Sequence, residues 1–165
     1  AIKAEYFPNT YQQGTTDNAP VKNQQPRTVT PTTIFKNVGE KFVLWDMEYQ
    51  VVSATNRGTT YSYKETTGKY LAIKIIATNM GKTQAGVNKI YLTDSQGRQY
   101  NADPLLLEFN SGSNPYGSYN NYSGIQPGIS ESFIAVVEVA KDSTDLELKY
   151  PSAQGYVVVS VRLGL

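Results

Sequence analysis

Three segments decide the fold: GKYLAIKIIATNMG (residues 68–81), VNKIYLTDSQGRQYNADP (87–104) and IQPGISESFIAVVEVAKD (125–142). The first alternates apolar and other residues and ends at Asn-x-Gly. The second places Asp-Ser-Gln-Gly between two short extended runs, which is a hairpin signal. The third has a Pro-Gly turn before a long apolar strand. This order of strands and turns is typical of an antiparallel β-sandwich, and it contains no catalytic constellation.

The alternation in the first segment predicts which face is buried. Leu71, Ile73, Ile75 and Ala77 fall on one face of a strand, and Lys74 falls on the other. Because a charged side chain seldom points into a core, we expect the first set to be buried. Asn79 and Gly81 tolerate a positive φ, which predicts that they close the strand.

Other segments continue the β pattern. No stretch longer than about ten residues carries the helical period. We therefore predict an all-β, immunoglobulin-like antiparallel sandwich of roughly seven to nine strands. The single tryptophan, Trp45, is expected in its core. Further strands are predicted at residues 38–45, 47–54, 131–139, 146–150 and 156–163.

Composition narrows the function classes. Fifteen Lys and Arg nearly balance fourteen Asp and Glu, which argues against nucleic-acid binding by phosphate neutralisation. The longest apolar runs have the length of strands and fall short of a membrane span. The sequence has no cysteine and no histidine, so disulfides, thiolate or imidazole metal sites and serine–histidine catalysis are excluded. We expect a protein that is not an enzyme.

Residues 1–37 differ from residues 38–165. They hold four of the eight prolines and scattered apolar residues, which disfavours a helix. We predict an extended N-terminal arm before a sandwich domain at 38–165; a disordered leader is the alternative. The start at Ala1 and the polar, Tyr-rich composition are typical of a processed extracellular protein. If the arm packs on another subunit, its contact residues are Ile2, Tyr6, Phe7, Val29, Ile34 and Phe35.

Residues 110–124, NSGSNPYGSYNNYSG, form a tract rich in Asn, Ser, Gly and Tyr. The tract is expected to be a long loop. Tyr116, Tyr119 and Tyr122 could make it a contact loop, because Tyr offers apolar area at low rotamer cost; a carbohydrate-stacking platform would use the same residues. Asn121 begins an Asn-x-Ser glycan acceptor.

Four aspartates could contribute to a Ca²⁺ site, since Ca²⁺ prefers oxygen ligands. Asp94, Asp103, Asp142 and Asp145 all fall in predicted turns. None follows a recognised calcium-binding loop, and turn-forming Asp is the commoner explanation. Calcium is therefore a weak expectation, and no other cofactor is expected.

The sequence also resembles a known family. The similarity rests on Val38-Gly-Glu, on residues 68–79 with Gly81 behind them, on residues 90–100, and on Gln126-Pro-Gly128. Together, over residues 38–150, these resemble an immunoglobulin-like domain of unknown function found on secreted and lipid-anchored bacterial and archaeal proteins. That family is sometimes labelled telomeric-repeat-binding-factor-like and is related to a secreted immunoprotective antigen. The resemblance implies a sandwich fold and a cell-surface location, without catalytic residues. Many members carry a lipidated cysteine, which this sequence lacks.

Two functions follow as hypotheses. The first is a structural subunit of a cell-surface filament, in which the arm donates a strand to the edge of a neighbouring copy. The second is a monomeric secreted or surface-located binding or adhesion module that uses Tyr-, Asn- and Ser-rich loops. The expected partner in the first case is another copy of the chain.

Overall fold

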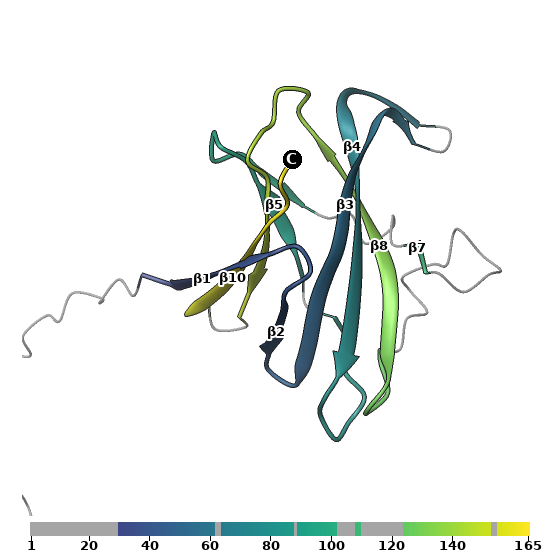
Figure 1. Ribbon diagram of the computed structural model, residues 1–165, viewed down its shortest axis with the longest axis vertical. Helices are drawn as coiled ribbons and strands as arrows, with labels where there is room; N and C mark the ends of the chain where they lie inside the picture. The colour runs from purple at the N-terminus through teal and green to yellow at the C-terminus, as the bar shows by residue number, and fades with distance from the viewer. Residues whose placement is uncertain (1–29, 62–63, 88, 102–107, 110–123, 153–154) are drawn as a thin grey trace, which may run out of the picture.

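The computed structural model describes residues 30–61, 64–87, 89–101, 108–109, 124–152 and 155–165. These ranges form two five-stranded sheets without a helix, packed face to face (Figure 1). Sheet A consists, in spatial order, of β1 (Thr32–Asn37), β10 (Val157–Arg162), β9 (Glu147–Pro151), β5 (Tyr91–Thr93) and β6 (Gln99–Asn101). Sheet B consists of β2 (Lys41–Leu44), β3 (Met47–Tyr61), β4 (Lys64–Asn79), β8 (Ser130–Val139) and β7 (Glu108–Phe109).

The strand order is that of an immunoglobulin-like sandwich. In sheet B, β3-β4-β8-β7 take the places of strands A, B, E and D, and in sheet A, β10-β9-β5-β6 take those of G, F, C and C′. The predicted all-β sandwich is confirmed: in the described ranges, nine strands have three or more residues, and β7 adds a strand of two residues. One pairing departs from the antiparallel pattern, because β1 runs parallel to β10.

The core lies between the sheets and follows the predicted alternation. Leu71, Ile73, Ile75 and Ala77 of β4 are fully buried, and Lys74 points away from the core, half-buried. Three aromatic rings close one region of the core. The rings of Phe42 and Tyr49 both pack on Tyr150 from the opposite sheet, with centroids 4.9 and 5.0 Å away.

Two predicted turns have the expected chemistry. The β5–β6 hairpin turns on Asp94, whose Oδ1 accepts hydrogen bonds from the amides of Gln96 (3.0 Å) and Arg98 (2.9 Å). Gly97 supplies the left-handed position with a φ of 75°. Gly128 does the same, with a φ of 73°, in the turn before β8. Left-handed backbone is accessible to glycine without a Cβ clash, so both turns are confirmed.

Strand β4 ends for a different reason from the one predicted. Neither Asn79 nor Gly81 is among the residues with positive φ. Instead, the buried Asn79 side chain donates to the carbonyls of Thr83 (2.7 Å) and Ile125 (2.8 Å) and accepts from the amide of Gly81 (2.8 Å). A Cβ on Gly81 would lie 3.0 Å from the Cβ of Asp46. The close approach, and not a left-handed backbone, accounts for the glycine.

Residues 32–37, inside the segment predicted as an arm, form β1 on the edge of sheet A. Its register places Ile34 opposite Val159 and Phe35 opposite Ser160. In Figure 1, β1 and the adjoining start of β10 extend away from sheet B. Part of the segment is therefore integrated in the sandwich through the chain's own C-terminal strand.

Candidate functional site

The predicted site residues divide into described and undescribed ones. Ile34, Phe35, Asp94, Asp142 and Asp145 belong to the described ranges. The other residues lie outside the described residues: Ile2, Tyr6, Phe7, Val29, Asp103, Tyr116, Tyr119, Asn121 and Tyr122. The arm's first strand, the tyrosine loop and the glycan acceptor therefore remain predictions.

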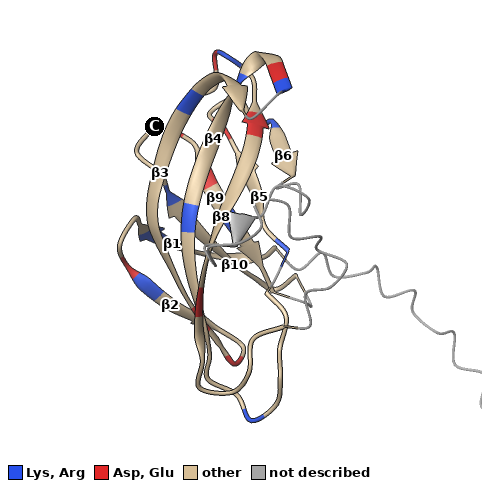
Figure 2. Cartoon of the chain, turned by 90° about the vertical axis from the view of Figure 1, so that its right-hand side faces the viewer, with Lys and Arg blue, Asp and Glu red and all other residues tan. Residues whose placement is uncertain are grey.

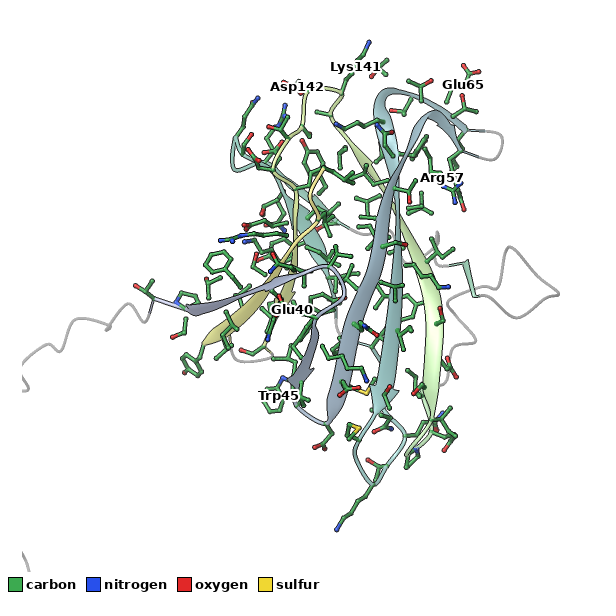
Figure 3. The ribbon with its side chains drawn as sticks, viewed as in Figure 1. Glu40, Trp45, Arg57, Glu65, Lys141 and Asp142 are labelled. Carbon is green, nitrogen blue, oxygen red and sulfur yellow. The ribbon has the colours of Figure 1, made fainter. Side chains whose placement is uncertain are left out.

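Asp94 is the centre of a compact polar cluster between the β5–β6 hairpin and the loop after β8. Its Oδ2 accepts hydrogen bonds from Arg98 Nε (2.7 Å), Tyr100 Oη (2.9 Å) and Ser143 Oγ (3.2 Å). Arg98 also donates to Asp142 Oδ1 over 3.0 Å. The guanidinium of Arg98 thus joins two of the predicted calcium ligands, Asp94 and Asp142. Figure 3 shows Asp142 at the upper end of the sandwich.

The electrostatics of the cluster favour a structural role. Burial by itself would raise the pKa of Asp94, but the hydrogen bonds from Arg98, Tyr100 and Ser143 outweigh it and hold the pKa well below its usual range. Hydrogen bonding to Arg98 likewise lowers the pKa of Asp142. Asp145 has a φ of 49°, which suits a turn. In the described ranges, no three His, Cys, Asp or Glu side chains are grouped so that they could hold a metal ion.

Strand β1 is an edge strand that contributes little to the core. Five of its six residues are exposed and the sixth, Lys36, is half-buried. Ile34 keeps 45% of its surface exposed and Phe35 keeps 51%. The Phe35 ring packs under the guanidinium of Arg162, 4.7 Å from its centroid, a cation–π contact. The strand is therefore attached mainly by backbone pairing with β10.

The face beneath Phe35 is polar and internally paired. Ser160 Oγ donates to Glu147 Oε2 (2.9 Å) and accepts from Lys149 Nζ (2.8 Å). Lys149 also forms an ion pair with Glu147. Because these groups satisfy one another within β9 and β10, this face of β10 retains its hydrogen bonds whichever strand covers it.

A second exposed surface lies at one end of the sandwich, here called the loop end and defined by Trp45, Met80 and Ile129. Their exposed fractions are 57%, 62% and 50%. The prediction that Trp45 belongs to the core is wrong. Trp45 occupies the two-residue turn between β2 and β3 with a φ of 59°, and Figure 3 shows its ring outside the sheets. The register of the hairpin, in which Leu44 and Met47 are buried partners, places the intervening Trp45 at the tip.

Charges of both signs are interspersed along the strands, without a large patch of one sign in the view of Figure 2. This distribution agrees with the nearly equal numbers of basic and acidic residues in the sequence. The part of the chain that the structure describes also contains no helix that could span a membrane.

Comparison with known proteins supports the fold. The chain is similar to an uncharacterised β-sandwich protein of Clostridium difficile 630, with a TM-score of 0.62, 15% identity, and coverage of 82% of this chain and 99% of that one. It is also similar to the yjhA protein of Bacillus subtilis, with a TM-score of 0.52, 10% identity, and coverage of 76% and 97%. No protein-family model and no curated protein matches the sequence. The fold class is therefore a β-sandwich shared with bacterial proteins.

Proposed function

We propose that this chain is a non-enzymatic extracellular structural protein whose copies assemble at the cell surface by exchange of β1. The observation that carries the proposal is that β1 is exposed on both faces and is attached to β10 through its backbone. A strand held in this way is separable from the core at little cost in buried apolar area.

Exchange would preserve the contacts of β1. When β1 of one copy replaces β1 of another, the backbone pairs to β10 and the Phe35–Arg162 contact form again between chains. Each copy then gives one strand and accepts one, so the contact is head to tail. Head-to-tail contacts build an open filament unless the rotation between copies closes a ring. The undescribed residues before β1 could extend the contact.

The extracellular location rests on the sequence. Its polar, Tyr-rich composition and its resemblance to the sandwich domain of secreted and lipid-anchored proteins both favour the cell surface. The fold agrees with that resemblance at the level of a β-sandwich. In the described residues, the one buried carboxylate, that of Asp94, is bound by Arg98, which suits a structural protein.

A matched pair of proline variants tests the exchange. The amide of Thr32 donates to Tyr156 of the C-terminal segment. Because the bonding direction alternates along a strand, the amide of Ile34 also points to β10 and that of Thr33 points away. Ile34→Pro therefore removes a bond between the strands, whereas Thr33→Pro leaves the pairing intact.

We expect the unmodified chain and Thr33→Pro to form oligomers that grow with protein concentration, and Ile34→Pro to remain monomeric with the same circular dichroism spectrum. Sedimentation velocity and negative-stain microscopy measure both. Monodisperse monomers for all three chains would overturn the proposal.

The second candidate is a monomeric binding module. It is favoured by the loop end, because a bulky residue held at positive φ is costly and is often retained for a function. Monomers in the proline experiment, together with a ligand whose binding requires Trp45, would favour this candidate.

A further inference from the structure

The loop end is built from three chain segments that the backbone ties together. The amide of Met80 donates to the carbonyl of Asp46 (2.7 Å), and the amide of Asn79 donates to the carbonyl of Ile129 (3.0 Å). The amide of Gly128 returns a bond to the carbonyl of Asn79 (2.8 Å). Trp45, Met80 and Ile129 each belong to, or directly adjoin, these bonded residues. Three exposed apolar side chains from separate loops therefore gather at one end.

The exposure of the three side chains is unusual for a loop. Loop tips are ordinarily polar or glycine-rich, because they face water. Here each of the three neighbouring loops presents a large apolar residue that is at least half exposed. Trp45 in addition holds a left-handed backbone, which costs an L-residue about 1–2 kcal/mol. Glycine would relieve this strain, and the exposed ring contributes little to the core, so the indole itself is the feature to be explained.

Several backbone groups of the loop end are paired with one another or with the Asn79 side chain. The Asn79 side chain satisfies the carbonyls of Thr83 and Ile125 and the amide of Gly81. The amide of Ile129 donates to the carbonyl of Gln126 (3.1 Å). In an apolar medium each unpaired backbone group costs several kcal/mol. The groups that are paired in this way can leave water without that penalty.

From these observations we propose that the loop end inserts shallowly into the interfacial layer of a phospholipid bilayer, with Trp45, Met80 and Ile129 as the inserted side chains. Trp favours the interface because its ring is apolar and its Nε1–H can reach water or headgroups. Lys82, exposed in the same loop as Met80, can extend to the phosphates. The exposed Asp46 balances that charge, so the binding depends on apolar area and only weakly on anionic lipid.

A lipid surface suits this end better than a second copy of the chain. The three apolar residues lie in separate loops beside the ends of β2, β4 and β8, and Figure 3 shows Trp45 directed outward at the lower end of the molecule. A bilayer interface accepts such projecting side chains individually, whereas a protein partner must offer a matching pocket for each. The proposal is independent of β1 exchange, because β1 contributes none of these residues.

Trp45 is the only tryptophan and reports directly on its own surroundings. The full chain is mixed with phosphatidylcholine vesicles, with and without phosphatidylglycerol, and both co-sedimentation and tryptophan emission are recorded. We expect the protein to pellet with both kinds of vesicle, the emission to shift to the blue, and high salt to leave the binding in place.

Four variants distinguish the loop end from other apolar surfaces. Met80→Ser and Ile129→Ser should each weaken vesicle binding by about tenfold and reduce the blue shift. Phe35→Ser removes an equally exposed apolar side chain from β1 and should bind as the unmodified chain does. Ile34→Pro should also bind, which separates this proposal from the assembly of β1.

Two results would overturn the proposal. One is the absence of vesicle binding by the full chain, or binding that is equal in all variants. The other is a blue shift that appears without vesicles and grows with protein concentration, because the loop end would then be a contact between copies of the chain. Circular dichroism of each variant confirms that the sandwich is folded.

Discussion

Replacing Asn79 by alanine is expected to be among the most destabilising single substitutions of a polar residue in this protein. The side chain is fully buried and makes three hydrogen bonds to backbone groups, all between 2.7 and 2.8 Å. In Asn79→Ala, water can reach the amide of Gly81 and the carbonyl of Thr83, so each loss costs about 0.5–1 kcal/mol. The carbonyl of Ile125 keeps its hydrogen bond from the amide of Ala85 (3.1 Å), so the loss of the bond from Asn79 costs about 1 kcal/mol there.

The sum is about 2–3 kcal/mol, a large part of the 5–15 kcal/mol by which domains of this size are usually stable. Urea unfolding followed by circular dichroism measures it, and the midpoint should fall without a change in slope. Asn79→Asp keeps the oxygen that accepts from the amide of Gly81. It replaces the nitrogen that donates to Thr83 and Ile125 by a carboxylate oxygen, which faces their carbonyls. It should destabilise at least as strongly at pH 7 and recover partly on acidification.

Asn56→Ala is the matched control. Asn56 also bonds the amide of the residue two positions later, Gly58, over 2.8 Å, but in an exposed part of β3. We expect Asn56→Ala to lower the free energy of unfolding by less than about 0.5 kcal/mol. If Asn79→Ala costs no more than Asn56→Ala, the account of how the strand and the loop end are held together is wrong.

Three further predictions concern strain, burial and pH. At Trp45, the Gly variant should be more stable than the Ala variant by about 1 kcal/mol in chemical unfolding, the reverse of the usual order, because only glycine relieves a φ of 59°; equal stabilities would refute the strain. Tyr150→Phe should stabilise by about 1 kcal/mol in calorimetry, because its buried hydroxyl has no hydrogen-bond partner among the described residues, and a loss of stability would contradict this. Hydrogen bonds outweigh burial and depress the folded-state pKa of Asp94, so its contribution is fully present at neutral pH and is lost as the pH falls below about 4. Asp94→Asn should flatten that part of the stability profile, and an unchanged acid slope would show that the cluster does not contribute to it.

The elements that the sequence predicts well are those set by local chemistry. Alternation along residues 71–77 identifies the buried face, because side chains on a strand point in turn to opposite sides. Asp94 and Gly97 identify a hairpin, because its bonds lie within a few residues. These features require no knowledge of distant segments.

The features that escape prediction depend on contacts between distant segments. The bonds of Asn79 include one to Ile125, and β1 pairs in parallel with a strand at the other end of the chain. The exposure of Trp45 also escapes prediction, because its apolar character indicates the core. Only one residue, Asp46, separates the predicted strands 38–45 and 47–54, which indicates a turn beside Trp45, but only the register of the hairpin shows that Trp45 occupies the tip.

The exchange of β1 is tested most directly by mixed cysteine variants, because the sequence contains no cysteine of its own. Thr33 and Val158 are partners in the register of β1 and β10. A chain carrying Thr33→Cys is mixed with a chain carrying Val158→Cys, and the mixture is unfolded, refolded and oxidised. In the control mixture, a chain carrying Thr55→Cys in β3 takes the place of the chain carrying Val158→Cys. We predict a larger yield of disulfide-linked dimer in this mixture than in the control mixture. Equal, trace-level crosslinking in both mixtures, while the double variant closes its disulfide within one chain, would contradict the account.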